Sequence, residues 1–200
     1  YGKVNWTVGG LAVGNYVVIA TYSGNANYTD AAVTDDFKVL QIGTVLDVDV
    51  HNIPVWDTEY VNVTIKDAAG NIITNATGNV TINIDGVDYT AEIKDGVARF
   101  NISDLTIGHK FVWAFYDGDN NLTGSRLMAQ FDVTQRVPEV NVTALNITVD
   151  QDGKITINIP ANATGFVILS GNFTKSPIYV DKFTNGVAEI TVNDLAVGNY

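Results

Sequence analysis

An internal repeat is the feature of this sequence that most constrains its fold. The segment Gly10–Gly24 (GLAVGNYVVIATYSG) resembles Asp104–Gly118 (DLTIGHKFVWAFYDG), 94 residues further along the chain, and Asp194–Tyr200 (DLAVGNY) begins in the same way. The first match continues without a gap as far as Phe131 and Val133. Solenoid repeats have periods of about 20–50 residues, whereas a span of about 90 residues is enough for one small autonomous domain. The repeat therefore predicts a tandem array of small domains.

Two further matches define the limits of the repeats. The segment Asp95–Gly108 (DGVARFNISDLTIG) resembles Asn185–Gly198 (NGVAEITVNDLAVG), 90 residues further on, and the letters NATG occur at Asn75–Gly78 and at Asn162–Gly165. We therefore expect three parts: the C-terminal half of an Ig-like repeat in residues 1–40, a complete repeat in 41–135, and the N-terminal part of a third in 136–200. On this interpretation the chain is a piece of a longer tandem protein.

Within the central repeat, apolar and polar residues alternate, which is the pattern of strands with one buried face. In Tyr60–Lys66 (YVNVTIK) and Asn79–Asp85 (NVTINID), every second residue is valine or isoleucine. The dipeptide Asp-Gly, typical of tight hairpin turns, occurs at 85–86, 95–96 and 117–118. Seven strands are expected, near 44–50, 59–66, 79–85, 88–94, 97–102, 110–116 and 127–134. This pattern predicts an all-β fold of tandem immunoglobulin-like β-sandwich repeats, with one complete seven-stranded domain flanked by two partial ones.

A short motif at the repeat corner points to a family. The pattern L-x-x-G-x-Y in Leu11–Tyr16 is typical of the loop before strand F, where a tyrosine hydroxyl bonds back to the backbone. Through Gly10–Val33 and Asp194–Tyr200, the chain resembles the group 3 type of bacterial and archaeal Ig-like domain repeats in methanogen adhesin-like surface proteins. The resemblance implies an extracellular stalk or adhesin repeat without catalytic residues. Lys110 stands where the other copies have tyrosine, so the central repeat departs from the motif there.

Composition argues against several classes of partner. The formal net charge is −11 at pH 7, from 22 acidic and 11 basic residues, which argues against binding to nucleic acid or to anionic lipid. The chain has no cysteine, and therefore neither disulfides nor thiolate chemistry. It has no run of 18 apolar residues, so we expect no membrane insertion in this segment. No cofactor is expected.

Few residues are suited to catalysis. The sequence has two histidines, His51 and His109, and five serines, and it lacks the HExxH, GxSxG and phosphate-loop motifs. His51 follows Asp47 and Asp49 in the same alternation, which is typical of a solvent-exposed strand face. His109 occupies the place of Asn15 in the first copy, within a turn. The sequence therefore predicts a protein that is not an enzyme.

Asparagine glycosylation is one hypothesis for the polar faces. The chain has eleven Asn-x-Ser/Thr sequons, whereas its 21 Asn and 26 Ser or Thr residues would give about three by chance. Alternation itself can place Asn and Thr two positions apart, so polar filling of strand faces is the alternative. Asn is depleted in strands, which favours sugar acceptors. The candidate acceptors are Asn5, Asn27, Asn62, Asn75, Asn79, Asn101, Asn121, Asn141, Asn146, Asn162 and Asn172.

The central repeat carries an aromatic stripe that the first copy lacks. If strand F keeps the register of the repeat, Phe111, Trp113 and Phe115 point outward, where the first copy has two aliphatic residues and a threonine. Exposed rings beside the amides of Asn79 and Asn83 can stack on sugar rings or anchor a protein partner. The alternative is that a neighbouring domain or loop covers the rings.

The segment after this stripe contains half of a calcium-loop pattern. Asp117, Asp119 and Asn121 place oxygen atoms at alternate positions, as calcium loops do. The first copy has SGNAN in the same place, with no carboxylate. A plain turn is therefore the alternative to a calcium site.

These observations support three functional hypotheses. The first is a non-enzymatic structural spacer of a large cell-surface adhesin-like protein, whose partners are the neighbouring Ig-like repeats of the same chain. The second is a carbohydrate- or protein-binding module that presents the face around Trp113 to a cell-surface glycan or protein. The third is a spacer domain of a secreted polysaccharide-degrading enzyme. Because residues 1–40 and 136–200 each correspond to part of a sandwich, pairing of half-domains between molecules is a further hypothesis.

Overall fold

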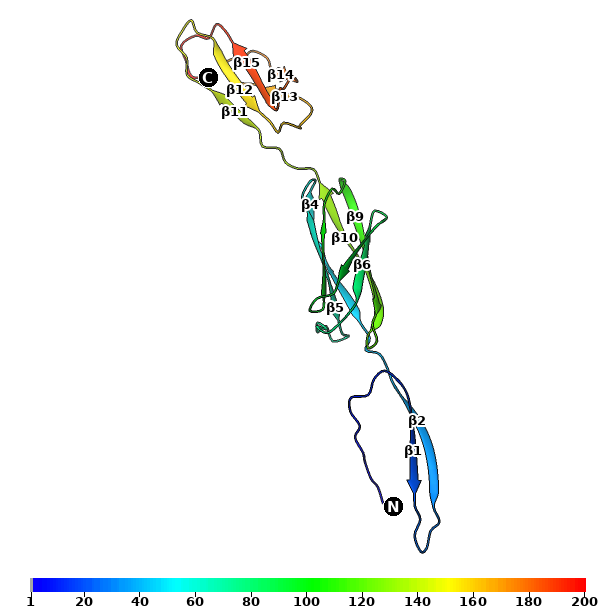
Figure 1. The fold of residues 1–200 in the computed structure, drawn as a ribbon. Helices are drawn as coiled ribbons and strands as arrows, with labels where there is room; N and C mark the ends of the chain where they lie inside the picture. Colours follow the sequence, from blue (N-terminus) through cyan, green and yellow to red (C-terminus); the bar gives the residue numbers. More distant parts are fainter. Residues whose placement is uncertain (1) are drawn as a thin grey trace. The chain divides into compact units, whose positions relative to one another are not determined.

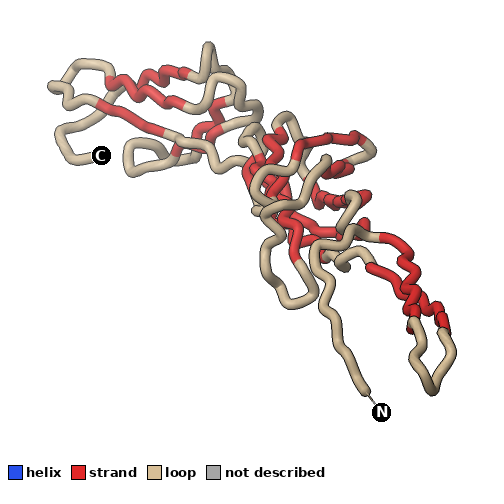
Figure 2. The backbone as a smooth tube through the Cα atoms, turned by 60° about the horizontal axis from the view of Figure 1, so that its bottom comes forward, coloured by secondary structure: helices blue, strands red, loops and turns tan. Residues whose placement is uncertain are grey.

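The computed structural model describes residues 2–200, and all of its regular elements are β-strands (Figure 2). The chain divides into two compact units, one that ends at Gln135 and one that begins at Arg136. The first unit contains an N-terminal hairpin and a central sandwich, and the second contains five shorter strands. Among the described residues, no helix is long and apolar enough to cross a membrane.

The central sandwich consists of two sheets around one core (Figure 1). One sheet has the strand order β3-β5-β8 and the other has β4-β10-β9-β6-β7. The strands are β3 (Val45–Asp49), β4 (Ile53–Pro54), β5 (Glu59–Lys66), β6 (Asn79–Ile84), β7 (Val87–Glu92), β8 (Val97–Ile102), β9 (Gly108–Gly118) and β10 (Thr123–Thr134). The seven longer strands form the immunoglobulin-like sandwich that the alternation predicts.

Two features of these strands differ from the sequence prediction. Strand β4 was not predicted, because its two residues are too few to show alternation; it pairs in parallel with the end of β10. Strand β9 begins at Gly108, earlier than expected, and β10 begins at Thr123. The prediction that His109 lies in a turn is therefore wrong, because the backbone pairing of β9 with β10 extends past it. Asp117 also lies within β9 rather than in a separate loop.

Apolar side chains at alternate positions of both sheets fill the core. On β5, Val61, Val63 and Ile65 have no exposed surface, and the same holds for Ile82 on β6. Each strand buries one face because successive side chains point to opposite sides, and burial of one such side chain contributes about 1.5–3 kcal/mol. All fully buried members of this core lie within residues 46–133.

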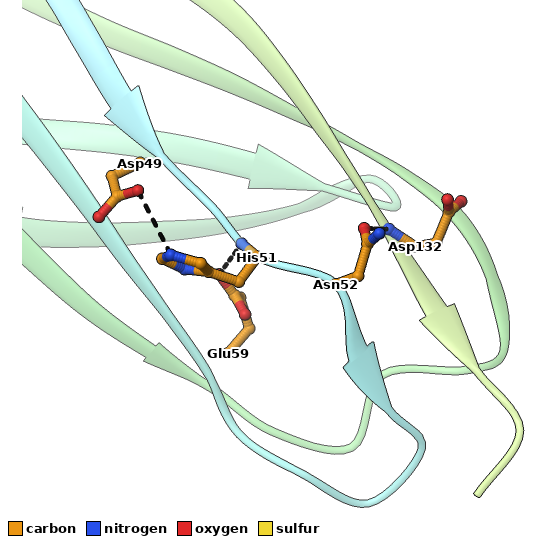
Figure 3. A network of polar contacts seen from close by, with 5 residues as sticks. All are labelled: Asp49, His51, Asn52, Glu59 and Asp132. Atoms are coloured by element: carbon orange, nitrogen blue, oxygen red, sulfur yellow. Dashed lines mark hydrogen bonds and ion pairs between the residues drawn. The ribbon is translucent and has the colours of Figure 1, made fainter.

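A polar network lies at one end of the central sandwich (Figure 3). Glu59, at the start of β5, is 1% exposed and accepts a hydrogen bond of 2.8 Å from the backbone N–H of His51. The imidazole of His51 is exposed, with Nε2 at 3.7 Å from a carboxylate oxygen of Asp49. Beside it, the side-chain oxygen of Asn52 accepts a hydrogen bond of 2.7 Å from the backbone N–H of Asp132. These bonds connect the segment between β3 and β4 to both sheets.

The N-terminal hairpin repeats the last two strands of the sandwich. It consists of β1 (Gly14–Tyr22) and β2 (Ala31–Val39). Ala20 lies opposite Val33 in the hairpin, and Ala114 lies opposite Leu127 in the sandwich. The residue numbers of these two pairs differ by 94. Every other residue pair of the hairpin also has a corresponding β9–β10 pair 94 residues further along the chain. The hairpin therefore has the register of the strand F and strand G pair of an Ig-like domain.

The C-terminal unit repeats the remaining strands. It contains β11 (Asn141–Ala144), β12 (Gly153–Asn158), β13 (Val167–Leu169), β14 (Ile178–Val180) and β15 (Val187–Val192). The order β11-β12-β15 matches β3-β5-β8, and the pair β13-β14 matches β6-β7. Its small core contains Ile155, Ile157, Leu169, Val180 and Ala188. Within residues 136–200, no strand takes the place of β9 or β10.

The corner motif forms the expected hydrogen bond in both copies that carry tyrosine. The hydroxyl of Tyr16 donates to the carbonyl oxygen of Ala12 at 2.8 Å, and the hydroxyl of Tyr200 donates to that of Ala196 at the same distance. In each case the acceptor lies four residues before the tyrosine. The bond stabilises the loop that leads into strand F.

The central repeat uses a different bond at this corner. Lys110 is 4% exposed, and its ammonium donates to the hydroxyl oxygen of Thr106, again four residues earlier, at 2.9 Å. It also donates to a carboxylate oxygen of Asp85, in the turn between β6 and β7, at 2.5 Å. The corner of the central repeat is therefore connected by side chains rather than by a tyrosine–backbone bond.

Candidate binding face

The outward side of the β6-β9-β10 sheet carries the predicted aromatic stripe. Phe111 and Trp113 are 47% and 48% exposed, and Phe115 is half-buried. Between them, Val112 and Ala114 have no exposed surface. The register predicted from the repeat is therefore confirmed for β9. Half of the surface of two large rings is left open to solvent, and we refer to this surface as the aromatic face.

The neighbours of Trp113 are an amide and a thioether. Trp113 lies opposite Asn83 on β6 and opposite Met128 on β10. The amide nitrogen of Asn83 donates to a carboxylate oxygen of Asp88 on β7 at 2.5 Å. Asn79 is exposed at the start of β6, four positions from Asn83. Of the two predicted amides, Asn83 therefore lies directly beside Trp113, whereas Asn79 lies at the opposite end of β6.

A histidine forms one end of the aromatic face. The ring of His109 packs edge-on against Phe111, with ring centroids 4.8 Å apart. Its Nδ1 lies 2.8 Å from a carboxylate oxygen of Asp132, and its Nε2 lies 3.3 Å from the side-chain oxygen of Gln130. The hydrogen bond to Asp132 raises the pKa of His109 above its ordinary value. The face therefore combines aromatic rings with an ionisable side chain whose protonated form is favoured by the carboxylate of Asp132.

This combination of groups is suited to recognition. At the other end of the face, the guanidinium carbon of Arg126 lies 5.9 Å from the ring centroid of Phe115, a cation–π contact. Flat rings can stack on the apolar side of a sugar, while amide, carboxylate and imidazole groups exchange hydrogen bonds with hydroxyls. The sequence did not identify His109 or Arg126 as members of the aromatic face. Their contacts form only where β9 pairs with β10, and the sequence does not show which residues of the two strands lie opposite each other.

The proposed calcium residues form a hydrogen-bonded turn. One carboxylate oxygen of Asp119 accepts the backbone N–H groups of Asn121 and Leu122, at 2.8 and 2.9 Å. The other accepts the backbone N–H and the hydroxyl of Thr77, at 3.0 and 2.9 Å. Burial acts to raise the pKa of Asp119, but these hydrogen bonds outweigh it and lower the pKa below its ordinary value. Asp119 therefore joins two loops, and this geometry lends the calcium hypothesis no support.

Metal ligands are not clustered elsewhere in residues 2–200 either. No group of three or more His, Cys, Asp or Glu side chains in this range is arranged to hold a metal ion. Asp117 and Asn121 are both exposed.

The candidate glycosylation sites are accessible with one partial exception. Ten of the eleven sequon asparagines are exposed, and Asn62 is half-buried. Asn62 lies on the middle strand of its sheet, between Asp49 on β3 and Arg99 on β8. On accessibility alone, Asn62 is the poorest acceptor of the set.

Comparisons with known proteins add one similarity. No protein-family model matches the chain, and no curated protein matches it. Among solved structures, it is similar to FdeC, a broadly conserved Escherichia coli adhesin that elicits protection against urinary tract infections. The sequence identity is 20%, the TM-score is 0.32, and the match covers 82% of this chain and 59% of that structure. The chain thus spans less than two thirds of the structure that it matches.

Proposed function

We propose that this chain is a non-enzymatic spacer segment of a large extracellular adhesin-like surface protein, built from bacterial or archaeal Ig-like repeats of the group 3 type. The observation that supports this most is the tandem register, in which β1 and β2 repeat β9 and β10 pair by pair. Domains repeated in this way extend a chain because each keeps its own core. In the central repeat, that core lies within residues 46–133.

The exposed sequons agree with a location outside the cell. Ten sequon asparagines are exposed, and Asn-x-Ser/Thr is an acceptor of sugars at the surface of secreted proteins. An antibody against residues 41–135 is therefore expected to label intact cells of the source organism. An antibody against a cytoplasmic protein is the control for cell integrity. Labelling that appears only after lysis would contradict the proposal.

Glycosylation of the exposed sequons follows from the same proposal. Protein purified from its source is expected to have an intact mass above 21.5 kDa for this segment, by increments of whole sugars. Peptide mapping is expected to show Asn62 less modified than exposed Asn101 on the same sheet. An unmodified mass would contradict glycosylation and would favour the alternative, in which the sequon residues only form the polar faces of strands.

A second candidate function is binding of a cell-surface glycan or protein through the aromatic face. The observation that favours it is the half-exposed Trp113 beside Asn83 and Met128. We expect the whole chain to bind members of a glycan array, and Trp113→Ala to abolish that binding without unfolding the sandwich. Ile19→Ala is the matched control, because Ile19 is exposed at the same position of the first copy. Equal binding by both variants would rule out this face as the site.

A further inference from the structure

The outward face of the β3-β5-β8 sheet, on the other side of the central sandwich from the aromatic face, is polar. Along β5, Val61 and Val63 are buried in the core, so the residues between them and beside them point outward. The register places the outward Asn62 between Asp49 of β3 and Arg99 of β8. This face contains a hollow of about 440 Å³, which we call the polar hollow. Its lining includes Asp47, Asp49, Asn62, Thr64, Val97 and Arg99.

Three side chains of the polar hollow have no partner. Within residues 2–200, the amide of Asn62, the hydroxyl of Thr64 and the guanidinium of Arg99 form neither a hydrogen bond nor an ion pair. The outward side of the other sheet differs, because the amide of Asn83 donates to Asp88 there at 2.5 Å. A guanidinium alone carries five N–H donors. These three groups are therefore available to a ligand.

Two carboxylates supply acceptors to the same hollow, and each is held by a basic residue. The ammonium of Lys66 donates to a carboxylate oxygen of Asp47 at 2.5 Å. Nε2 of His51 lies 3.7 Å from a carboxylate oxygen of Asp49 (Figure 3). A carboxylate has about four acceptor positions, and both aspartate side chains are more than half exposed. Asp47 and Asp49 therefore keep acceptor positions for a ligand.

An exposed aromatic ring lies beside the hollow. Tyr60 stands two positions before Asn62 on the same face of β5, and it is 61% exposed. It lies opposite Asn101 of β8. A ring of this kind can stack on the apolar side of a sugar, while amide, guanidinium and carboxylate groups exchange hydrogen bonds with hydroxyls. Both kinds of contact that a sugar needs are therefore present on this face.

We propose that the polar hollow binds a neutral sugar, which stacks against Tyr60. An anionic ligand would lie against Asp47 and Asp49, and a cationic ligand would lie against Arg99. Contact between like charges is unfavourable in both cases. A sugar hydroxyl both accepts and donates, so it accepts from the guanidinium and donates to either carboxylate. This site is separate from the aromatic face and does not depend on whether that face binds a ligand.

The same sugar chemistry can come from two sources. One is a glycan of another molecule. The other is a sugar attached to this chain at Asn101, which lies two positions from Arg99 on the same face of β8. Asn62 is also a sequon asparagine, but it lines the hollow itself. The proposal therefore makes Asn62 a contact of the bound sugar rather than an attachment site.

Binding is measured on the whole chain, produced in a host that attaches no sugar to asparagine. The chain carries Trp113→Ala, so that the aromatic face does not contribute. The probe is an array of neutral, acidic and basic oligosaccharides, and we expect neutral members to bind. Absence of binding to every neutral member would overturn the proposal.

Charge substitutions in the hollow test which kind of ligand it takes. Arg99→Ala is expected to weaken binding of the best neutral member at least about tenfold, because it removes charged donors. Asp47→Asn combined with Asp49→Asn is expected to weaken it about tenfold, because charged acceptors form stronger hydrogen bonds than neutral ones. If either change strengthens binding, the hollow prefers a charged ligand and the proposal fails.

Matched substitutions outside the hollow control for net charge. Arg136→Ala and Asp152→Asn replace exposed residues of the same types, and both are expected to leave the affinity unchanged. Circular dichroism in urea shows that each variant is folded, and Arg99→Ala is expected to keep its urea midpoint because Arg99 is exposed. Equal losses of affinity from Arg99→Ala and Arg136→Ala would overturn the proposal.

Protein purified from its source distinguishes the two sources of sugar. If a sugar on Asn101 occupies the hollow, the affinity for the neutral probe is expected to rise when the N-linked sugars are removed. Asn101→Gln is expected to abolish this rise. Equal affinity before and after removal assigns the hollow to glycans of other molecules. In both cases Arg99→Ala is expected to weaken binding.

An NMR titration with the best neutral member locates the bound sugar. The backbone amide signals of Asn62, Thr64 and Arg99 are expected to shift as the sugar is added. The signal of Met128, on the outward side of the other sheet, is the control and is expected to stay in place. Shifts that leave the three hollow residues unchanged would place the sugar elsewhere and would overturn the proposal.

Discussion

At the scale of single residues, Lys110 shows how a structural role can be kept with different chemistry. The tyrosine corner of the other copies uses one neutral hydrogen bond to a backbone carbonyl, as Tyr16 does. Lys110 is buried at the same position, and its ammonium is held by the hydroxyl of Thr106 and the carboxylate of Asp85. Because Asp85 is about half exposed, its charge stays solvated if the lysine is removed. In contrast, removal of the buried methylene chain of Lys110 leaves a space in the core that no other side chain fills.

Three replacements of Lys110 separate packing from charge. Lys110→Ala is expected to reduce the free energy of unfolding of the central domain by about 2–4 kcal/mol, because the buried stem leaves a cavity. Lys110→Met keeps the stem and is expected to cost about 1 kcal/mol, the value of the lost hydrogen bonds. Lys110→Tyr is expected to restore the tyrosine–backbone hydrogen bond of the corner beside Phe131, with a loss of unfolding free energy no larger than that of Lys110→Met. Urea unfolding followed by circular dichroism measures all three, and equal losses for Ala and Met would contradict the packing argument.

The pair of His109 and Asp132 makes a prediction about pH. Because the hydrogen bond raises the folded-state pKa of His109, protonated His109 stabilises the folded state. That stabilisation is fully present below about pH 6.5, the ordinary pKa, and is lost as pH rises through the raised value. An NMR titration of the His109 ring is expected to show a pKa above 6.5, and Asp132→Asn is expected to lower it. A titration unchanged by that substitution would contradict the assigned cause.

At the scale of elements, tight turns decide how the strands meet. Asp85-Gly86 and Asp95-Gly96 each have positive φ at both residues, 52° and 83° in the first and 52° and 78° in the second. Such turns match the twist of paired strands. The two glycines differ in their surroundings, however. A Cβ on Gly96 would lie 2.7 Å from the carbonyl oxygen of Ile73, whereas one on Gly86 would meet nothing within 4 Å.

Alanine at these two glycines is expected to have different costs. Gly86→Ala is expected to reduce the free energy of unfolding by about 1–2 kcal/mol, the cost of a left-handed backbone conformation for alanine. Gly96→Ala adds a clash with backbone and is expected to cost about 1–3 kcal/mol more. Thermal unfolding of both variants gives the comparison. If the two costs are equal, the close approach to Ile73 does not constrain the turn.

At the scale of the whole molecule, each unit keeps its own core. The core of the central sandwich lies within residues 46–133, and that of the C-terminal unit begins at Ile155. The segment just before the sandwich also belongs to it, because Ile42 pairs with Leu122 and the hydroxyl of Thr44 donates to the carbonyl oxygen of Thr123 at 2.7 Å. Residues 41–135 therefore include every contact that this core needs.

Residues 41–135 are accordingly expected to fold alone. Their urea midpoint is expected to equal that of the central domain within the whole chain, because hydrophobic burial is local to each core. Tryptophan fluorescence of Trp56 and Trp113 monitors the transition in both samples, with Trp6 replaced by Phe in the whole chain. A fragment that starts at residue 45 lacks the Ile42 and Thr44 bonds and is expected to be less stable. Loss of folding in the longer fragment would show that the domain limit is wrong.

Strands and their faces were largely predictable from the amino-acid order. A half-buried strand shows its buried side through alternation, so the inward register of β9 and the fold class followed from residues such as Val112 and Ala114. The tyrosine corner followed from a repeated motif of six letters. These are local properties, because a strand pattern depends only on neighbouring residues in the chain.

The contacts that connect loops, the repeat corner and the candidate site depend on pairs that are distant in the chain. Asp119 joins Thr77, 42 positions away, and Lys110 joins Asp85, 25 positions away. His109 finds Asp132 only because β9 and β10 pair in one register. Alternation identifies which side of a strand is buried but not which residue of another strand lies opposite. Those partners are set by the packing of the two sheets, so they could be read only from the folded chain.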